Sequence, residues 1–169
     1  MYANEGCPIY VEHVLAEHRR LHNMLRLARA AIVQSGGPDR DATTADLVRV
    51  FQQIRGELAH HFAEEEGGGC LEEAVSRCPR LSDQARRIEA EHPVLLRDLD
   101  ALIVEAQASE ESVEARRRME HAFKSLCERL HVHEAAENNL LRQAFGTNVN
   151  GDENGAGRKV VCSSGKKDG

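Results

Sequence analysis

Four segments of the chain place apolar residues at steps of three and four, and this periodicity restricts the fold more than any other feature. Strand-like alternation of apolar and polar residues is absent from the sequence. Each segment therefore predicts an amphipathic helix whose apolar stripe, called its seam below, packs against the other helices. The seams are Val14, His18, Leu21, Leu25, Ala28 and Ile32; Leu47, Phe51, Ile54, Leu58, His61 and Glu65; Ala85, Ile88, His92, Leu95, Leu99 and Leu102; and Met119, Leu126, Leu130, His133, Glu137, Leu140 and Ala144.

Glycine, proline and hydroxyl residues mark where the four helices begin and end. Short connections favour antiparallel neighbours, so we predict an all-α fold, an up-down-up-down antiparallel four-helix bundle over residues 8–145. A flexible, disordered C-terminal tail follows over 146–169, where Gly, Asn, Lys, Ser and Asp dominate. The first helix is expected between Pro8 and Gly36–Pro38, and the second from Thr43 or Thr44 to Gly67–Gly69, with helix resuming over 70–77 until Pro79. The third is expected from Ser82 to Ala108, with a kink or late start at Pro93, and the fourth from Ser109 to Phe145.

Composition excludes several classes of function. The chain has 169 residues, of which 41% are hydrophobic and 30% charged, as expected of a globular domain. Its net charge of −6 argues against a nucleic acid partner. We expect no membrane partner and a cytoplasmic location, since no apolar run has the length of a membrane span and no signal core precedes residue 13. Five cysteines without a C-x-x-C pair predict free thiols rather than disulfides, with a redox role for Cys70 and Cys78 as the alternative.

Histidine and glutamate residues interrupt the apolar seams at six positions. His61 and Glu65, like His133 and Glu137, are spaced i,i+4, which places both side chains on one helix face about one turn apart. A single buried histidine is commonly a hydrogen-bonded core residue, but buried carboxylates are costly unless they gain a partner. Six such groups together favour a metal centre. Mixed imidazole and carboxylate ligation suits iron or manganese, with zinc possible. The six residues are His18, His61, Glu65, His92, His133 and Glu137.

Antiparallel hairpins also predict the level of these residues along the bundle. His18 and His61 are equidistant from the first expected turn, and Glu65 and His92 are nearly equidistant from Pro79. The midpoint in sequence between His92 and His133, however, lies a few residues beyond the expected turn at Ser109. This register implies a mismatch of about one helical turn, roughly 5 Å, and therefore a staggered connection.

A second set of residues matches the Glu-x-x-His motifs of ferritin-like di-iron bundles. This set comprises Glu57, His60, Glu128 and His131, with Glu17 and Glu91 as the lone glutamates. Its members lie about 100° from the seams, on polar helix faces. Periodicity therefore favours a solvated face or a supporting role for them.

Four stretches carry a resemblance to a known family: EHRRLH (17–22), HFAEEE (61–66), EHPVLL (91–96) and HVHEAAENNLL (131–141). Together they resemble the hemerythrin-like, HHE cation-binding family, over roughly residues 10–145. The resemblance implies a non-haem di-iron centre of two iron ions with oxo or hydroxo and carboxylate bridges. It also implies that the six seam residues are the metal ligands and that Glu65 and Glu137 bridge the ions.

The chain departs from the oxygen-carrying members at two places. Leu96 stands where the third helix of those proteins has a second histidine, and Glu137 follows His133 by four residues where they have an aspartate at five. His22, one turn after His18, can supply the missing imidazole or can face outward. If His22 faces outward, a coordination position is open to water or a small ligand.

The leading functional hypothesis is a protein that binds or senses O₂ or a related diatomic such as NO, with the protein partner unknown. The alternative is a di-iron enzyme in iron oxidation, peroxide or NO detoxification, or iron-sulfur centre repair. The third hypothesis is a helical bundle in which a metal such as zinc has only a structural role. The sequence leaves open whether the protein is an enzyme.

Overall fold

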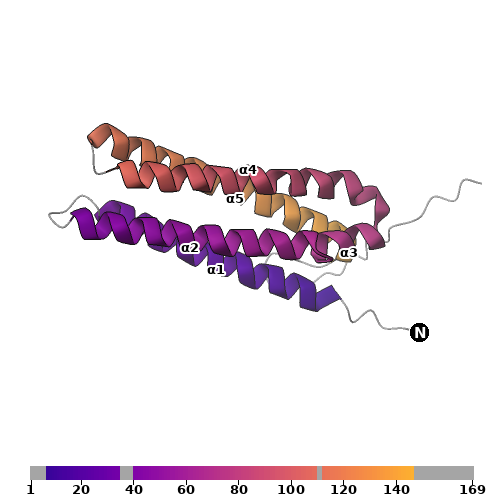
Figure 1. The fold of residues 1–169 in the computed structure, drawn as a ribbon. Helices are drawn as coiled ribbons and strands as arrows, with labels where there is room; N and C mark the ends of the chain where they lie inside the picture. Colours follow the sequence, from indigo (N-terminus) through magenta and orange to yellow (C-terminus); the bar gives the residue numbers. More distant parts are fainter. Residues whose placement is uncertain (1–6, 35–39, 110–111, 147–169) are drawn as a thin grey trace, which may run out of the picture.

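The computed structural model describes residues 7–34, 40–109 and 112–146, and these residues form an all-helical bundle. Figure 1 shows that the long helices lie side by side and that each runs opposite to the preceding long helix. The all-helical prediction is thus confirmed for the described part of the chain. The expected tail and the Gly36–Pro38 turn lie outside it. The elements are α1 (Cys7–Gln34), α2 (Arg40–Glu66), α3 (Cys70–Arg77), the 3₁₀ turn η1 (Pro79–Leu81), α4 (Ser82–Ala108) and α5 (Val113–Phe145).

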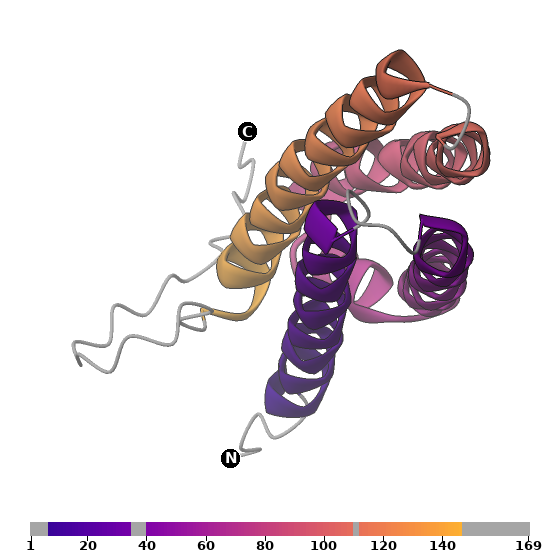
Figure 2. The same cartoon turned by 90° about the vertical axis from the view of Figure 1, so that its left-hand side faces the viewer.

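The four seams meet in the interior of the bundle. In Figure 2, α2 and α4 are seen nearly end-on, and α1 and α5 are inclined beside them. Phe51, Ile54, Leu99 and Leu102 are completely buried in the central cluster. Because burial of one such side chain contributes about 1.5–3 kcal/mol, the seams supply the main driving force for assembling the helices.

Three glycines separate α2 from α3. Gly68 has a φ of +93°, which favours glycine, and a Cβ on Gly69 would lie 2.1 Å from the Glu64 carbonyl oxygen. The chain can therefore turn sharply only because these positions lack side chains. The turn brings Cys70 and Leu71 of α3 into a second buried cluster with residues of α4 and α5. The predicted resumption of helix over 70–77 is confirmed.

The connection between α4 and α5 corrects two predictions. Ser109 is the C-cap of α4 and not the N-cap of the next helix, and Ser112 is that N-cap, where its Oγ accepts a hydrogen bond from Ala115 N at 3.1 Å. The rings of His92 and His133 have centroids 5.1 Å apart, so the expected mismatch of about one turn does not keep the two imidazoles from meeting.

Two smaller boundary predictions also change, and a third is confirmed. The helix α4 begins at Ser82 and continues through Pro93, so the late start is wrong. The helix α2 begins at Arg40, before either threonine. At the other end of the bundle, α5 ends at Phe145 as expected, with Gly146 at a φ of 67°.

The cysteines differ in state. Cys70 and Cys127 are free, but Cys78 is disulfide-bonded, so the expectation of free thiols is wrong at that position. Cys70 is buried, and burial raises the pKa of its thiol, which disfavours the reactive thiolate. The redox alternative therefore gains no support from Cys70. Among the described helices, none has both the length and the apolar character needed to cross a membrane.

Candidate metal centre

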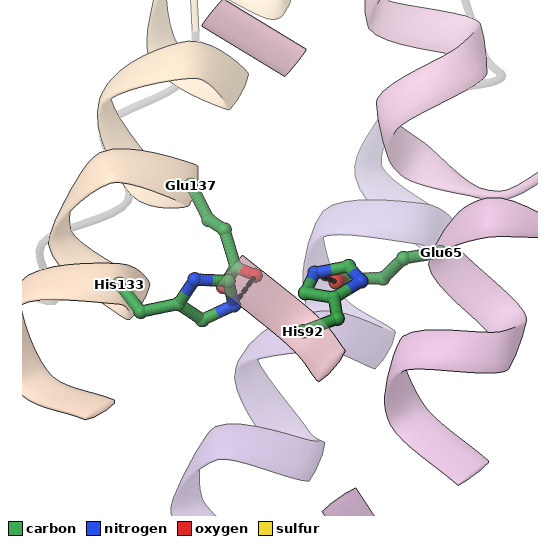
Figure 3. Close-up of side chains that lie close together, drawn as sticks. All are labelled: Glu65, His92, His133 and Glu137. Carbon is green, nitrogen blue, oxygen red and sulfur yellow. Dashed lines mark ion pairs between the residues drawn. The ribbon is translucent and has the colours of Figure 1, made fainter. Parts of the chain in front are cut away.

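The structure brings all six seam histidines and glutamates together in the interior of the bundle. Figure 3 shows four of them, Glu65, His92, His133 and Glu137, directed towards one another from α2, α4 and α5. His18 of α1 and His61 of α2 form a second group with Glu137. All six side chains are buried, and Glu137 has no exposed surface at all. A cluster of imidazoles and carboxylates so far from solvent is able to hold a metal ion.

Glu137 divides its two carboxylate oxygens between two histidines on different helices. Its Oε1 lies 2.8 Å from His133 Nε2, and its Oε2 lies 3.1 Å from His18 Nε2. The carboxylate of Glu137 therefore contacts imidazole nitrogens of two different helices, one through each oxygen.

Glu65 repeats this arrangement from the opposite helix. Its Oε1 lies 3.6 Å from His61 Nε2, and its Oε2 lies 3.4 Å from His92 Nε2. The His18 and His61 Nε2 atoms are themselves 3.3 Å apart. Each histidine pair, His18 with His61 and His92 with His133, thus has one oxygen from each glutamate beside it.

Several of these atoms approach one another closely but form no hydrogen bond. The contacts of Glu65 Oε2 with His92 and of Glu137 Oε1 with His133 have ion-pair distances, but neither has the geometry of a hydrogen bond. Buried polar atoms without partners are rare in folded proteins and call for a specific explanation. Lone pairs that converge without aligned donors suit a shared cation, so these residues fit a metal. The buried atoms without a hydrogen bond here are Glu65 Oε2, His92 Nε2, His133 Nε2, and Glu137 Oε1 and Oε2.

Carboxylates outside the cluster orient three of the imidazoles. An ionised carboxylate can only accept, so each of these contacts places a proton on Nδ1 and leaves the neutral ring with its Nε2 lone pair facing the cluster. Such outer carboxylates commonly fix the tautomer of metal-binding histidines. The contacts are His61 Nδ1 with Glu17 Oε2 at 2.8 Å, His92 Nδ1 with Glu66 Oε1 at 2.7 Å, and His133 Nδ1 with Glu91 Oε2 at 2.8 Å.

Phe62 supplies an apolar wall beside the same imidazoles. Its ring stacks on His92 with a centroid distance of 3.9 Å and an interplanar angle of 4°, and it meets His133 edge-on at 5.3 Å. The side chain is almost fully buried. Phe62 therefore restricts rotation of both rings and excludes water from their faces.

In the metal-free cluster, ion pairs between histidines and glutamates set the protonation of the buried side chains. Burial by itself lowers the pKa of His133, but contacts with Glu137 and Glu91 outweigh it and raise the value to about 9. Burial would raise the pKa of Glu137, yet its contacts with His133 and His18 keep that pKa below its usual range. Burial raises the pKa of Glu65. Protonated imidazoles thus provide the positive charge that a metal would supply.

His22 does not join the cluster. Its side chain is 55% exposed, and its Nε2 lies 2.6 Å from Glu134 Oε2. Leu96 packs against the hydrophobic core, as a leucine on a half-buried face is expected to. The structure therefore does not place a fifth imidazole from His22 beside the other four.

The ferritin-like set is not assembled. His60, Glu128 and His131 are exposed, and Glu57 contacts Arg20 at the surface. Glu17 and Glu91 instead hold Nδ1 of His61 and His133, which is the supporting role that periodicity favoured.

Sequence reasoning missed Glu66 and Phe62. Both lie on α2 between or beside recognised residues, but neither follows a spacing that distinguishes it from ordinary surface or core positions. Comparisons with protein-family models, curated proteins and solved structures find no match to this chain.

Proposed function

We propose that this protein is a non-haem di-iron protein of the hemerythrin-like type that binds or senses O₂ or a related diatomic such as NO. The observation that carries the proposal is the division of carboxylate oxygens. Glu65 and Glu137 each present one oxygen to the His18–His61 pair and the other to the His92–His133 pair. This symmetry provides two equivalent sets of ligands that share both carboxylates.

The donor set supports iron. Each set offers two imidazole nitrogens and two carboxylate oxygens, a mixture that suits iron and leaves coordination positions for an additional ligand. If two cations were bound, Glu65 and Glu137 would also supply the negative charge that offsets their mutual repulsion. Manganese accepts similar donors, so metal analysis is part of the test.

The residues around the cluster prepare it for a small ligand. Glu17, Glu66 and Glu91 hold the imidazoles in the orientation that directs Nε2 inward. Phe62 and the surrounding leucines keep bulk water away from the cluster. When bound, a pair of iron ions supplies the reversible redox chemistry and the open position that a diatomic ligand requires.

Anaerobic iron loading followed by gas addition tests the proposal. Protein purified without added metal is analysed for bound metals, loaded with Fe(II), and exposed to O₂ or NO while the absorption spectrum is recorded. We expect two irons per chain and a new ligand-dependent band. Glu128→Gln with His131→Ala is the matched control, because it removes the same residue types from the exposed alternative set and should leave the band intact.

Three outcomes separate the candidate functions. A chain that holds two irons but shows no ligand-dependent band would refute the diatomic-binding proposal. Multiple-turnover consumption of NO or peroxide, abolished in Glu65→Ala, would favour the enzyme. One zinc without iron, with the fold retained in His133→Ala, would remove the basis of both redox functions.

A further inference from the structure

A pocket of about 310 Å³ opens beside the buried cluster, between α1, the end of α2 and the beginning of α3. Its lining includes His13, Glu17 and Glu64 together with the Gly67–Gly69 turn. Glu65, one of the two glutamates of the buried cluster, also lines it. The pocket therefore connects a group of surface residues with the proposed metal centre.

Three side chains in this pocket form a second group with the geometry of metal ligands. His13 Nε2 lies 3.0 Å from Glu64 Oε2 and 3.6 Å from Glu17 Oε1. One ligand atom from each residue lies within 4.8 Å of the other two. We call His13, Glu17 and Glu64 the outer triad. His60 Nε2 lies 3.4 Å from the second oxygen of Glu64, so another imidazole is close to the triad.

The second observation is the buried carboxylate that shares the pocket. Glu65 is 2% exposed, and its Oε2 makes no hydrogen bond. Glu65 lines the pocket, and its Oε2 lies 3.4 Å from His92 Nε2 in the inner cluster, so a cation passing through the pocket would meet a carboxylate of that cluster next to Glu64. An unsatisfied buried acceptor calls for a specific partner, and a cation delivered through this pocket would supply one.

Glu17 connects the outer triad to the inner cluster. Its Oε1 faces His13, and its Oε2 accepts a hydrogen bond from His61 Nδ1 at 2.8 Å. A single carboxylate therefore belongs to the triad and supports an inner imidazole. The two groups are neighbours linked by shared residues, and a cation held in one is close to the other.

We propose that the outer triad captures a divalent cation from solution and passes it through this pocket to the inner cluster. The passage to the inner cluster rests on the proposed metal centre. The triad is suited to capture because its two carboxylates attract cations and its side chains are more exposed than those of the inner cluster. Clefts lined by one sign of charge raise association rates by about tenfold or more. His13 and Glu64 are exposed and Glu17 is half-buried, so the triad holds the ion more weakly than the inner cluster, which favours transfer inward.

The test measures the rate of iron uptake separately from the final iron content. Metal-free full-length protein is mixed anaerobically with Fe(II), and free Fe(II) is followed by rapid quenching with a chromogenic chelator. The variant His13→Ala with Glu64→Gln removes two triad residues and spares Glu17, which also supports His61. His121→Ala with Glu120→Gln is the matched control, because it removes the same residue types from exposed positions on α5.

We expect the triad variant to load iron about tenfold more slowly than the wild type and to reach the same final content. The control variant should load at the wild-type rate. Loading of the triad variant at the wild-type rate would overturn the inference. A triad variant with slow loading and a lower final content would also overturn it, because the mutated residues would then be needed to retain iron.

A direct measurement keeps this inference distinct from the proposed function. Mn(II) is added to the protein, and the NMR resonances of the His13 ring are followed for paramagnetic broadening. Broadening at His13 that is lost in Glu64→Gln would support capture by the triad, and absence of broadening would refute it. Failure of the wild type to retain iron would instead refute the inner centre, whatever happens at His13.

Discussion

Replacement of Glu91 is the most direct way to separate metal binding from ordinary bundle stability. Glu91 is 49% exposed, whereas its partner His133 is 2% exposed, and they meet at 2.8 Å. If the contact orients His133 towards a metal, Glu91→Ala should weaken metal binding much more than it weakens the fold. Outer partners of metal-binding histidines typically contribute about 10–100-fold in affinity.

The magnitude depends on what remains after substitution. Glu91→Gln keeps a neutral acceptor for His133 Nδ1, and a charge-assisted hydrogen bond is roughly twice as strong as a neutral one. We therefore expect a loss of about tenfold for Glu91→Gln and about 100-fold for Glu91→Ala, or roughly 1.4 and 2.8 kcal/mol of binding free energy. The metal-free variants should lose at most about 1 kcal/mol of unfolding free energy, because the carboxylate is half exposed.

Chelator competition measures the affinity, and denaturant unfolding of the metal-free protein measures the stability. Glu128→Gln is the control, since Glu128 is 67% exposed on the same bundle and pairs only loosely with Lys124 at 3.8 Å. Equal affinities for wild type and Glu91→Ala would refute the assignment of Glu91 as an orienting residue. An equal loss in Glu128→Gln would mean that general surface charge, and not orientation of His133, controls affinity.

Two further predictions concern the metal-free cluster and the glycine turn. The pKa of His133 is raised to about 9 from 6.5, so its contribution is fully present below pH 6.5 and is lost as the pH rises to 9. Denaturant unfolding should show a decrease of up to about 3 kcal/mol over that range, and Glu137→Gln should reduce it, because Glu137 is the largest contributor to the raised pKa. Gly69→Ala should strongly destabilise the fold in thermal unfolding, because its Cβ would meet the Glu64 carbonyl at 2.1 Å. Gly56→Ala, with nothing within 4 Å, should stabilise α2 by about 0.5–1 kcal/mol, and equal effects at both positions would contradict the steric account.

The sequence alone determined which faces of the helices are buried and which chemistry they carry. A residue three or four positions along an α-helix lies on the same face, so apolar spacing identified the seams without any tertiary information. The same rule placed His61 with Glu65 and His133 with Glu137 in the interior, and all four are buried. The glycines before Cys70 and the proline after Cys78 likewise indicated the helix breaks, because their effects on the backbone are local.

Only the tertiary structure decided which side chains meet across the helices. Glu17 is adjacent to His18 in the sequence, but in the bundle its carboxylate contacts His61. Likewise, the carboxylate of Glu91 contacts His133. Glu66 contacts His92, and no spacing in the sequence indicates that partner. Periodicity specifies the face of each helix but not its rotation and level relative to a neighbour, which depend on the packing of all seams and on the length of each turn. The start of α5 after Ser112 instead of Ser109 is one such difference in turn length, and the rings of His92 and His133 meet with centroids 5.1 Å apart.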